Sequence, residues 1–198
     1  WADHYDKIPI EHRVLNDANF PGTVLRLPAV YGPNDGQHRL FPTLKRIDDK
    51  RPFMLLEETC AKWRFCRGYV ENVAAGIVLA LTNPVAANKI YNISETYTHT
   101  TAEWDQKIAD ATQWSGQIKV LPQSQMPKHL VDDDANWTQN LNTDSTRIRQ
   151  ELEYQEIVPL DEALQRTIAW ERENPPKQID EAQFDYAAED QAFQQYVN

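Results

Sequence analysis

The chain has 198 residues, of which 41% are hydrophobic and 25% charged, and this composition is typical of a globular protein and excludes a disordered or fibrous one. Its 30 acidic and 20 basic residues give a formal net charge of -10, and no concentrated basic stripe offsets it, which excludes a nucleic-acid partner. The longest nearly uninterrupted apolar stretch, Val73 to Leu81, is about half as long as a membrane-spanning helix needs to be, so we expect no membrane partner.

Two cysteines, Cys60 and Cys66, are too few for a disulfide framework and lack the paired spacing of a zinc site. We expect both to be reduced and buried, and the protein to be cytoplasmic. The five histidines are scattered, and Asp132-Asp133-Asp134 lacks the spacing and turn glycine of a calcium loop, so we expect no metal site. Because the chain begins with Trp1 and not Met, we expect the natural protein to extend upstream.

Hydrophobic periodicity and turn signals predict a mixed α/β order. In the first half of the chain they predict a helix over 10–16, a strand over 23–27, a loop over 31–36, a short helix over 40–47, and two strands over 53–56 and 63–66 around a charged turn.

The second half begins with a helix over 70–81, which stops at Asn83-Pro84. Further on, the patterns predict a strand over 89–93, a helix opened by a capping box at Thr100 and Glu103, a strand over 118–121, a helix holding Ile148 and Leu152, and another helix from Pro159 through Ile168. Pro175-Pro176 ends the globular pattern, and the acidic, Gln-rich segment 177–198 reads as an appended helix or a partner-binding arm.

Several catalytic motifs are absent from the sequence. It has no Gly-x-Ser-x-Gly elbow, no His-Glu-x-x-His, no Walker loop and no Gly-x-Gly-x-x-Gly. With six glycines in the whole chain, no segment brings several backbone amides to a pyrophosphate.

Four short motifs occur in a characteristic order. They are Leu25-Arg26-Leu27-Pro28-Ala29-Val30-Tyr31-Gly32-Pro33, Tyr69-Val70-Glu71-Asn72-Val73-Ala74, Lys89-Ile90-Tyr91-Asn92-Ile93-Ser94 and Asp144-Ser145-Thr146-Arg147-Ile148-Arg149-Gln150-Glu151-Leu152. In this order they resemble the extended short-chain dehydrogenase/reductase family, in its NAD-dependent epimerase/dehydratase branch. The resemblance covers roughly Tyr5 to Asn174.

The resemblance implies an α/β fold, namely the C-terminal part of a doubly wound, Rossmann-like parallel sheet plus a smaller α/β substrate domain. It assigns residues 1–34 to the last elements of the cofactor-binding sheet and 35–176 to a mixed substrate-binding domain, whose return helix 70–82 and strand 89–93 pack on the sheet. Residues 177–198 form the acidic tail. Family members open with a strand, a glycine-rich turn and a helix that binds the cofactor pyrophosphate, and the sequence contains no such opening.

Tyr5 and Lys7 are the candidate catalytic residues. In the family a tyrosine and a lysine four residues apart act together: the ammonium lowers the pKa of the phenol and holds the ribose, and the phenol exchanges a proton with the substrate hydroxyl. Here the two residues stand two apart, and Asp3 occupies the family's tyrosine position. Residues two apart on a helix point to nearly opposite sides, although Pro9 allows an irregular backbone in which the two side chains converge. The alternative is a surface tyrosine and a solvated lysine at a helix start.

The resemblance places the remaining candidates around the nicotinamide and the substrate. It assigns cofactor binding to Lys7, Pro28, Ala29 and Val30, although the family often has an asparagine where Ala29 stands. It assigns substrate binding to Tyr31, His38 and Arg39, and to Arg64 or Arg67, one of which would grip a substrate diphosphate through the planar guanidinium. An exposed loop position is the alternative for His38 and Arg39, and an ion pair with Glu57, Glu58 or Glu71 is the alternative for the two arginines.

The function implied is that of part of an NAD(P)-dependent epimerase/dehydratase or reductase acting on a small hydroxylated or nucleotide-sugar-like substrate. One alternative is a non-catalytic binding or scaffold module of the same ancestry, and another is an unrelated α/β scaffold whose tail recruits a partner. We expect NAD or NADP to bind the full-length protein and not this chain alone, which would then be inactive. The expected partners are the small-molecule substrate, the missing N-terminal segment and a second copy of the protein, because an incomplete sheet leaves an unpaired edge.

Overall fold

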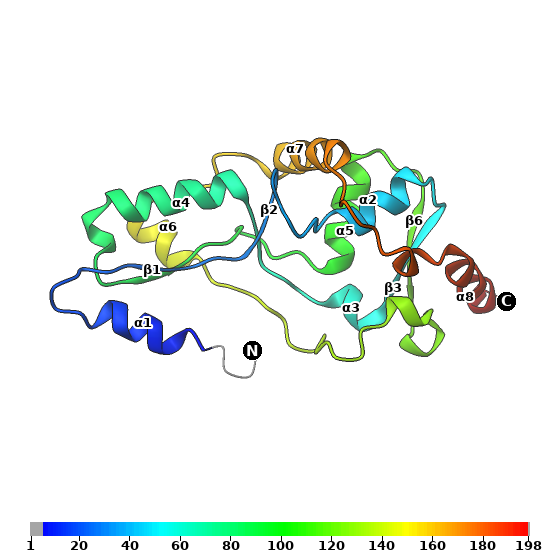
Figure 1. Ribbon diagram of the computed structural model, residues 1–198, viewed down its shortest axis with the longest axis horizontal. Coiled ribbons are helices and arrows are strands. Elements are labelled where there is room, and N and C mark those ends of the chain that lie inside the picture. Colours follow the sequence, from blue (N-terminus) through cyan, green and yellow to red (C-terminus); the bar gives the residue numbers. More distant parts are fainter. Residues whose placement is uncertain (1–5, 198) are drawn as a thin grey trace. The chain divides into compact units, whose positions relative to one another are not determined.

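Three pairs of short parallel strands, connected by helices, form the framework of the computed structural model in Figure 1, which describes residues 6–197. The helices and strands, in chain order, are α1 (Ile8–Leu15), β1 (Val24–Arg26), β2 (Ala29–Tyr31), α2 (Phe41–Asp48), β3 (Phe53–Glu57), α3 (Glu58–Lys62), β4 (Arg67–Tyr69), α4 (Val70–Thr82), η2 (Pro84–Ala86), β5 (Ile90–Asn92), α5 (Thr101–Ala111), β6 (Gln117–Leu121), η3 (Gln123–Gln125), η4 (Lys128–Leu130), α6 (Thr146–Leu152), α7 (Leu160–Glu173), η5 (Glu181–Phe184) and α8 (Tyr186–Val197).

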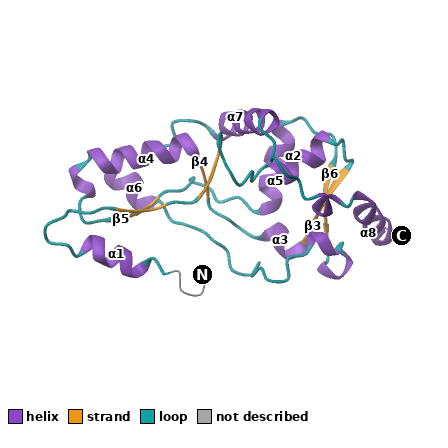
Figure 2. Cartoon of the chain, in the orientation of Figure 1, coloured by secondary structure: helices purple, strands orange, loops and turns teal. Residues whose placement is uncertain are grey.

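The strand pairs are β1 with β5, β2 with β4, and β3 with β6, and all three are parallel. Parallel pairs need a crossover connection, and helices or helical turns supply it here (Figure 2). The α/β class expected from the sequence is thereby confirmed.

The chain divides into two compact units. Unit 1 consists of residues 1–31, 66–97 and 143–159, and unit 2 consists of residues 32–65, 98–142 and 160–198. Residues 35–176, which were expected to form one substrate-binding domain, contribute to both units. Residues 177–198, which were expected to form a separate tail, group with unit 2.

In unit 1, α1 contacts β1, while α4 contacts β2, β4 and α6. The core lies where α4 and α6 meet β5, and its buried members are Val73, Ala80, Ala86, Tyr91, Ile93, Ile148, Leu152 and Tyr154. Asn72 connects distant segments of this unit through two hydrogen bonds of 2.9 Å, since its side-chain amide donates to the Val158 carbonyl and accepts the Val158 N–H. The predicted helix over 70–81 and the predicted strand over 89–93 are confirmed as α4 and β5.

In unit 2, the C-terminal helix α8 packs on the β3–β6 pair. Leu55, Leu121 and Ala192 form the buried cluster, and the rings of Phe53 and Phe193 lie 4.5 Å apart.

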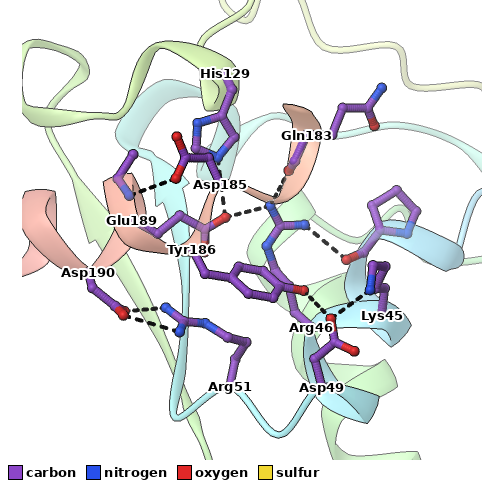
Figure 3. A network of polar contacts seen from close by, with 12 residues as sticks. Lys45, Arg46, Asp49, Arg51, His129, Gln183, Asp185, Tyr186, Glu189 and Asp190 are labelled. Carbon is purple, nitrogen blue, oxygen red and sulfur yellow. Dashed lines mark hydrogen bonds and ion pairs between the residues drawn. The ribbon is translucent and has the colours of Figure 1, made fainter. Parts of the chain in front are cut away.

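Polar contacts also hold α8 in place within unit 2 (Figure 3). The Arg46 guanidinium donates to the buried Glu189 carboxylate at 2.7 Å and to the Gln183 carbonyl at 2.9 Å. Arg51 pairs with Asp190, and the Tyr186 hydroxyl donates to Asp49 at 2.6 Å. The segment after Pro176 is therefore an integral part of unit 2.

Two strand predictions need correction. The strand expected over 23–27 is the shorter β1, and a second strand, β2, follows it and extends into the expected loop over 31–36. Pro28 separates the two because it has no N–H for a ladder, and pairing resumes where the Ala29 N–H donates to the Cys66 carbonyl. The charged turn expected after residue 56 is the helix α3, whose first amides, those of Thr59 and Cys60, are capped by the Glu57 carboxylate. The expected strand over 63–66 consists only of isolated bridges, and the strand in this region is β4.

Within residues 6–197, none of the helices combines the length and the apolar character that crossing a membrane requires.

Candidate functional site

Lys7 immediately precedes α1, as its N-terminal cap residue, and its side chain is exposed. Its carbonyl accepts the Glu11 N–H at 3.0 Å, so the backbone is already helical in type at this residue. Tyr5 lies outside the described residues, and its catalytic pairing with Lys7 stays a prediction.

The parallel pairing of β2 with β4 brings two groups of candidates together. In this register Ala29 lies opposite Arg67, Val30 opposite Gly68, and Tyr31 opposite Tyr69. Thus β2, which follows Pro28 and carries the cofactor candidates Ala29 and Val30, neighbours one of the two arginines expected to bind a diphosphate.

Gly68 permits the close approach of β2 to β4. A Cβ atom at this position would lie 2.8 Å from Pro28 Cγ and 2.8 Å from Val73 Cγ2. This distance is shorter than the van der Waals contact of two carbon atoms, so a side chain here would push β2 and β4 apart.

The Tyr31 side chain is 1% exposed and donates its hydroxyl proton to Glu95 Oε1 at 2.8 Å. Burial raises the pKa of Tyr31, and the adjacent Glu95 charge raises it further. Burial also raises the pKa of Glu95, which the Tyr31 hydrogen bond and the Arg67 charge oppose. Because the Tyr31 hydroxyl already donates its hydrogen bond to Glu95, it is unsuited to donate a proton to a ligand.

His38 and Arg39 follow β2 on a loop that contains several left-handed residues, among them Gly32 (φ 134°), Asn34 (φ 69°) and His38 (φ 49°). The Asp35 carboxylate organises this loop, because it accepts the backbone N–H of Gln37 at 3.0 Å and pairs with the Arg39 guanidinium at 2.5 Å. A histidine in the left-handed region is uncommon and needs support from its surroundings.

That support comes from α7. His38 Nδ1 lies 2.8 Å from Glu171 Oε2, and the imidazole stacks on Trp170 with 5.7 Å between ring centroids. Glu171 is 2% exposed, and its burial raises the pKa of the carboxyl group, an effect that the His38 hydrogen bond opposes.

Arg64 and Arg67 lie in different units. Arg64 Nη1 donates to the Thr98 carbonyl and lies 3.5 Å from the Glu103 carboxylate, which belongs to the capping box of α5. Arg64 thus forms an ion pair with Glu103, a partner that was not among those expected for its alternative role. Arg67 lies near Glu95 and Tyr31, on whose pKa values its charge acts.

Three further residues of this region, Glu95, Trp170 and Glu171, were not predicted from the sequence. Glu95 follows the strand motif that ends at Ser94, and Glu171 is 133 residues from His38. No local spacing connects such residues, and only the order of the four motifs gave a signal near Glu95.

No group of three or more His, Cys, Asp or Glu side chains in residues 6–197 has the arrangement of a metal site. Cys60 and Cys66 are free thiols, and burial raises the pKa of Cys60 to about 11.

Residues 7–94 match the sequence model described as "NAD dependent epimerase/dehydratase family". No curated protein matches the chain.

Solved structures with a similar fold include UDP-glucose 4-epimerase from Thermotoga maritima, with 19% identity, a TM-score of 0.63, and coverage of 86% of this chain and 53% of that chain. UDP-glucuronic acid 4-epimerase from Bacillus cereus, in complex with UDP-glucuronic acid and NAD, has 15% identity and a TM-score of 0.61, with coverage of 83% and 49%. dTDP-glucose 4,6-dehydratase from Bacillus anthracis, in complex with NAD, has 16% identity and a TM-score of 0.62, with coverage of 83% and 50%.

The chain spans about half the length of these proteins. Residues 7–94 carry the sequence signature of the NAD-dependent epimerase/dehydratase family, and the chain has the fold of solved epimerases and dehydratases, which confirms the resemblance drawn from its four motifs.

Proposed function

We propose that the chain is part of an NAD(P)-dependent epimerase, dehydratase or reductase that acts on a small hydroxylated or nucleotide-sugar-like substrate. The match over residues 7–94 carries this proposal, because that segment contains Lys7, the β2 strand end and Arg67. The similar epimerases and dehydratase whose complexes contain NAD, and in one case UDP-glucuronic acid, support both the cofactor class and the substrate class.

The described residues suit only part of a dinucleotide. The exposed Lys7 ammonium can bind ribose hydroxyls, and Pro28, Ala29 and Val30 offer an apolar strand end for the nicotinamide. The chain's six glycines form no phosphate-binding turn. When bound, NAD(P) would supply hydride transfer, and the role of this chain would be to orient the substrate and exchange its hydroxyl proton.

A non-catalytic binding module of the same ancestry is the second candidate. Two observations favour it. Tyr5 and Lys7 are two residues apart instead of four, and the Tyr31 hydroxyl already donates its proton to Glu95, so neither tyrosine is clearly suited to act as the acid in proton transfer. In either case we propose a cytoplasmic protein, with which the two free thiols are compatible, and a homo-oligomer.

Calorimetric titration of the full-length protein with NAD and NADP, followed by turnover measurements on two variants, tests the proposal. We expect Tyr5→Phe to lower turnover by about 10²–10⁴-fold while cofactor affinity stays nearly unchanged, because only the phenolic proton is lost. Lys7→Ala should reduce both, since one ammonium serves the ribose and the phenol.

Absence of cofactor binding in the full-length protein would contradict the enzyme proposal. Cofactor binding together with unchanged turnover in Tyr5→Phe would move proton transfer to another group. Cofactor binding with no turnover on any nucleotide sugar would favour the non-catalytic module.

A further inference from the structure

The pair formed by His38 and Glu171 has an asymmetric hydrogen-bonding pattern. Glu171 Oε2 contacts His38 Nδ1 at 2.8 Å, whereas Glu171 Oε1 is buried and has no hydrogen-bond partner among the described residues. A buried carboxylate oxygen without a partner is costly if the group carries a full, uncompensated charge.

A proton on the pair, additional to the one that a neutral imidazole carries, removes that cost. The proton resides either on the carboxyl group, which then donates to Nδ1, or on Nδ1 of an imidazolium that neutralises the carboxylate. In both forms Nε2 also carries a proton. A bare carboxylate facing a neutral Nδ1–H imidazole lacks the additional proton, and only in that form is Nε2 an acceptor.

Other charged groups near Glu171 already have partners. Arg39 pairs with Asp35 at 2.5 Å, and Asp35 itself disfavours a charged Glu171. The cavity of about 220 Å³ that Glu171 shares with α2 and the end of α7 contains two further ion pairs, Lys45–Asp49 at 2.7 Å and Arg172–Asp48 at 2.6 Å. On α5, which packs on α2 and α7, Asp105 accepts the Thr43 hydroxyl. His38 is thus the group that compensates Glu171.

The imidazole is fixed in orientation as well as in protonation. Trp170 stacks on one face at an interplanar angle of 17°, and the left-handed backbone of His38 sets the direction in which its side chain leaves the loop. The His38 side chain remains 21% exposed, and Nε2 has no partner among the described residues.

We propose that Glu171 is a positioning residue that holds a proton on His38 Nε2, so that His38 donates a hydrogen bond to a phosphate-type oxyanion of the bound ligand. A ring that presents Nε2–H accepts no hydrogen bond there, so the ligand atom must be an acceptor, and an anionic phosphate oxygen is a stronger acceptor than a neutral hydroxyl or carbonyl oxygen. The inference rests on the proposed function, in which His38 contacts the substrate, and it specifies the atom and the chemical group.

Nitrogen-15 NMR of the histidine side chains in the full-length protein at pH 7.5 tests the positioning role directly. The His38 signals are assigned by their loss in His38→Ala. We expect a protonated Nε2 and a slowly exchanging proton shared between Nδ1 and the Glu171 carboxyl group, and we expect Glu171→Met to abolish the shared proton. Glu162→Met, at an exposed glutamate of the same helix that pairs with Arg166, is the matched control and should leave it in place. An unprotonated Nε2 in the unsubstituted protein would overturn the proposal.

Calorimetric titration with UDP and, separately, with inorganic phosphate tests the ligand. His38→Ala and Glu171→Met should each weaken UDP binding by about tenfold or more, while the double variant is no weaker than His38→Ala alone, because Glu171 acts through His38. Additive losses would overturn the positioning role. If Glu171→Met does not fold, Glu171→Gln completes the same cycle.

The outcomes separate this inference from the proposed function. Competition of inorganic phosphate with UDP at His38 would support an oxyanion site of either origin, and binding of UDP unaffected by His38→Ala would refute the site. A protein that binds neither NAD(P) nor UDP would contradict the proposed function, and the protonation of Nε2 would still decide the role of Glu171.

Discussion

The ionisation of Glu151 depends on three hydrogen-bonding neighbours. Its carboxylate accepts from Lys89 Nζ and the Tyr91 hydroxyl, each at 2.7 Å, and from Arg147 Nε at 3.0 Å. These hydrogen bonds lower the pKa of Glu151 to about 2 from 4.5, whereas burial and the Glu151 hydrogen bond raise the pKa of Tyr91 to about 12.

Because the pKa of Glu151 is lower in the folded than in the unfolded protein, its carboxylate stabilises the folded state at pH values above about 4.5. This contribution disappears as the pH falls from about 4.5 toward 2. We therefore expect Glu151→Gln to flatten the pH dependence of the thermal midpoint within that window and to lower the midpoint at neutral pH. Calorimetric scans across the window measure this. Glu153→Gln, at an exposed glutamate two residues further on, should keep the full dependence, and an unchanged slope in Glu151→Gln would contradict the assignment.

At the scale of a secondary-structure element, the pairing of β2 with β4 depends on the absence of a side chain at Gly68. A Cβ there would overlap Pro28 and Val73, so we expect Gly68→Ala to lower the free energy of unfolding by about 1–3 kcal/mol. Gly36→Ala is the matched control, because a Cβ at position 36 has no heavy atom within 4 Å. Denaturant titration of the two variants measures the difference, and equal stabilities would show that β2 can move away from β4 without cost.

Elements with a strong local signal were predictable from the sequence. The apolar periodicity over 70–81 gave α4, and Thr100 with Glu103 gave the capping box that the structure contains at α5. The five-residue helix α3 is too short to show a period, so the side-chain cap from Glu57 was not recognised.

Contacts between distant residues were not predictable in the same way. Arg46 and Glu189 are 143 residues apart, and His38 and Glu171 are 133 apart. Resemblance to a family identified the segment that carries Ala29 and Tyr31, but it gave no indication of Glu95 or Glu171, since neither belongs to a quoted motif.

At the scale of the whole molecule, the attachment of α8 can be tested by placing a charge in its interface. Ala192 is 9% exposed and belongs to the cluster with Leu55 and Leu121, so Ala192→Asp should destabilise the docking of α8 by about 2 kcal/mol or more. Hydrogen exchange of the β3 and β6 amides should accelerate accordingly.

Gln195→Asp adds the same charge at an exposed position of the same helix and should leave this exchange unchanged. If both variants exchange alike, α8 does not protect the β3–β6 pair.

The interleaving of the two units constrains how the chain can fold. Three segments of each unit alternate along the sequence, so the polypeptide passes from one to the other five times, and neither unit exists as a continuous stretch. Unit 1 can complete its contacts only after Val158, which bonds Asn72, has been synthesised. Unit 2 can complete its contacts only after α8 has been synthesised. Such high contact order slows folding, and it makes the newly synthesised chain dependent on protection of its exposed apolar strands until α8 has been synthesised.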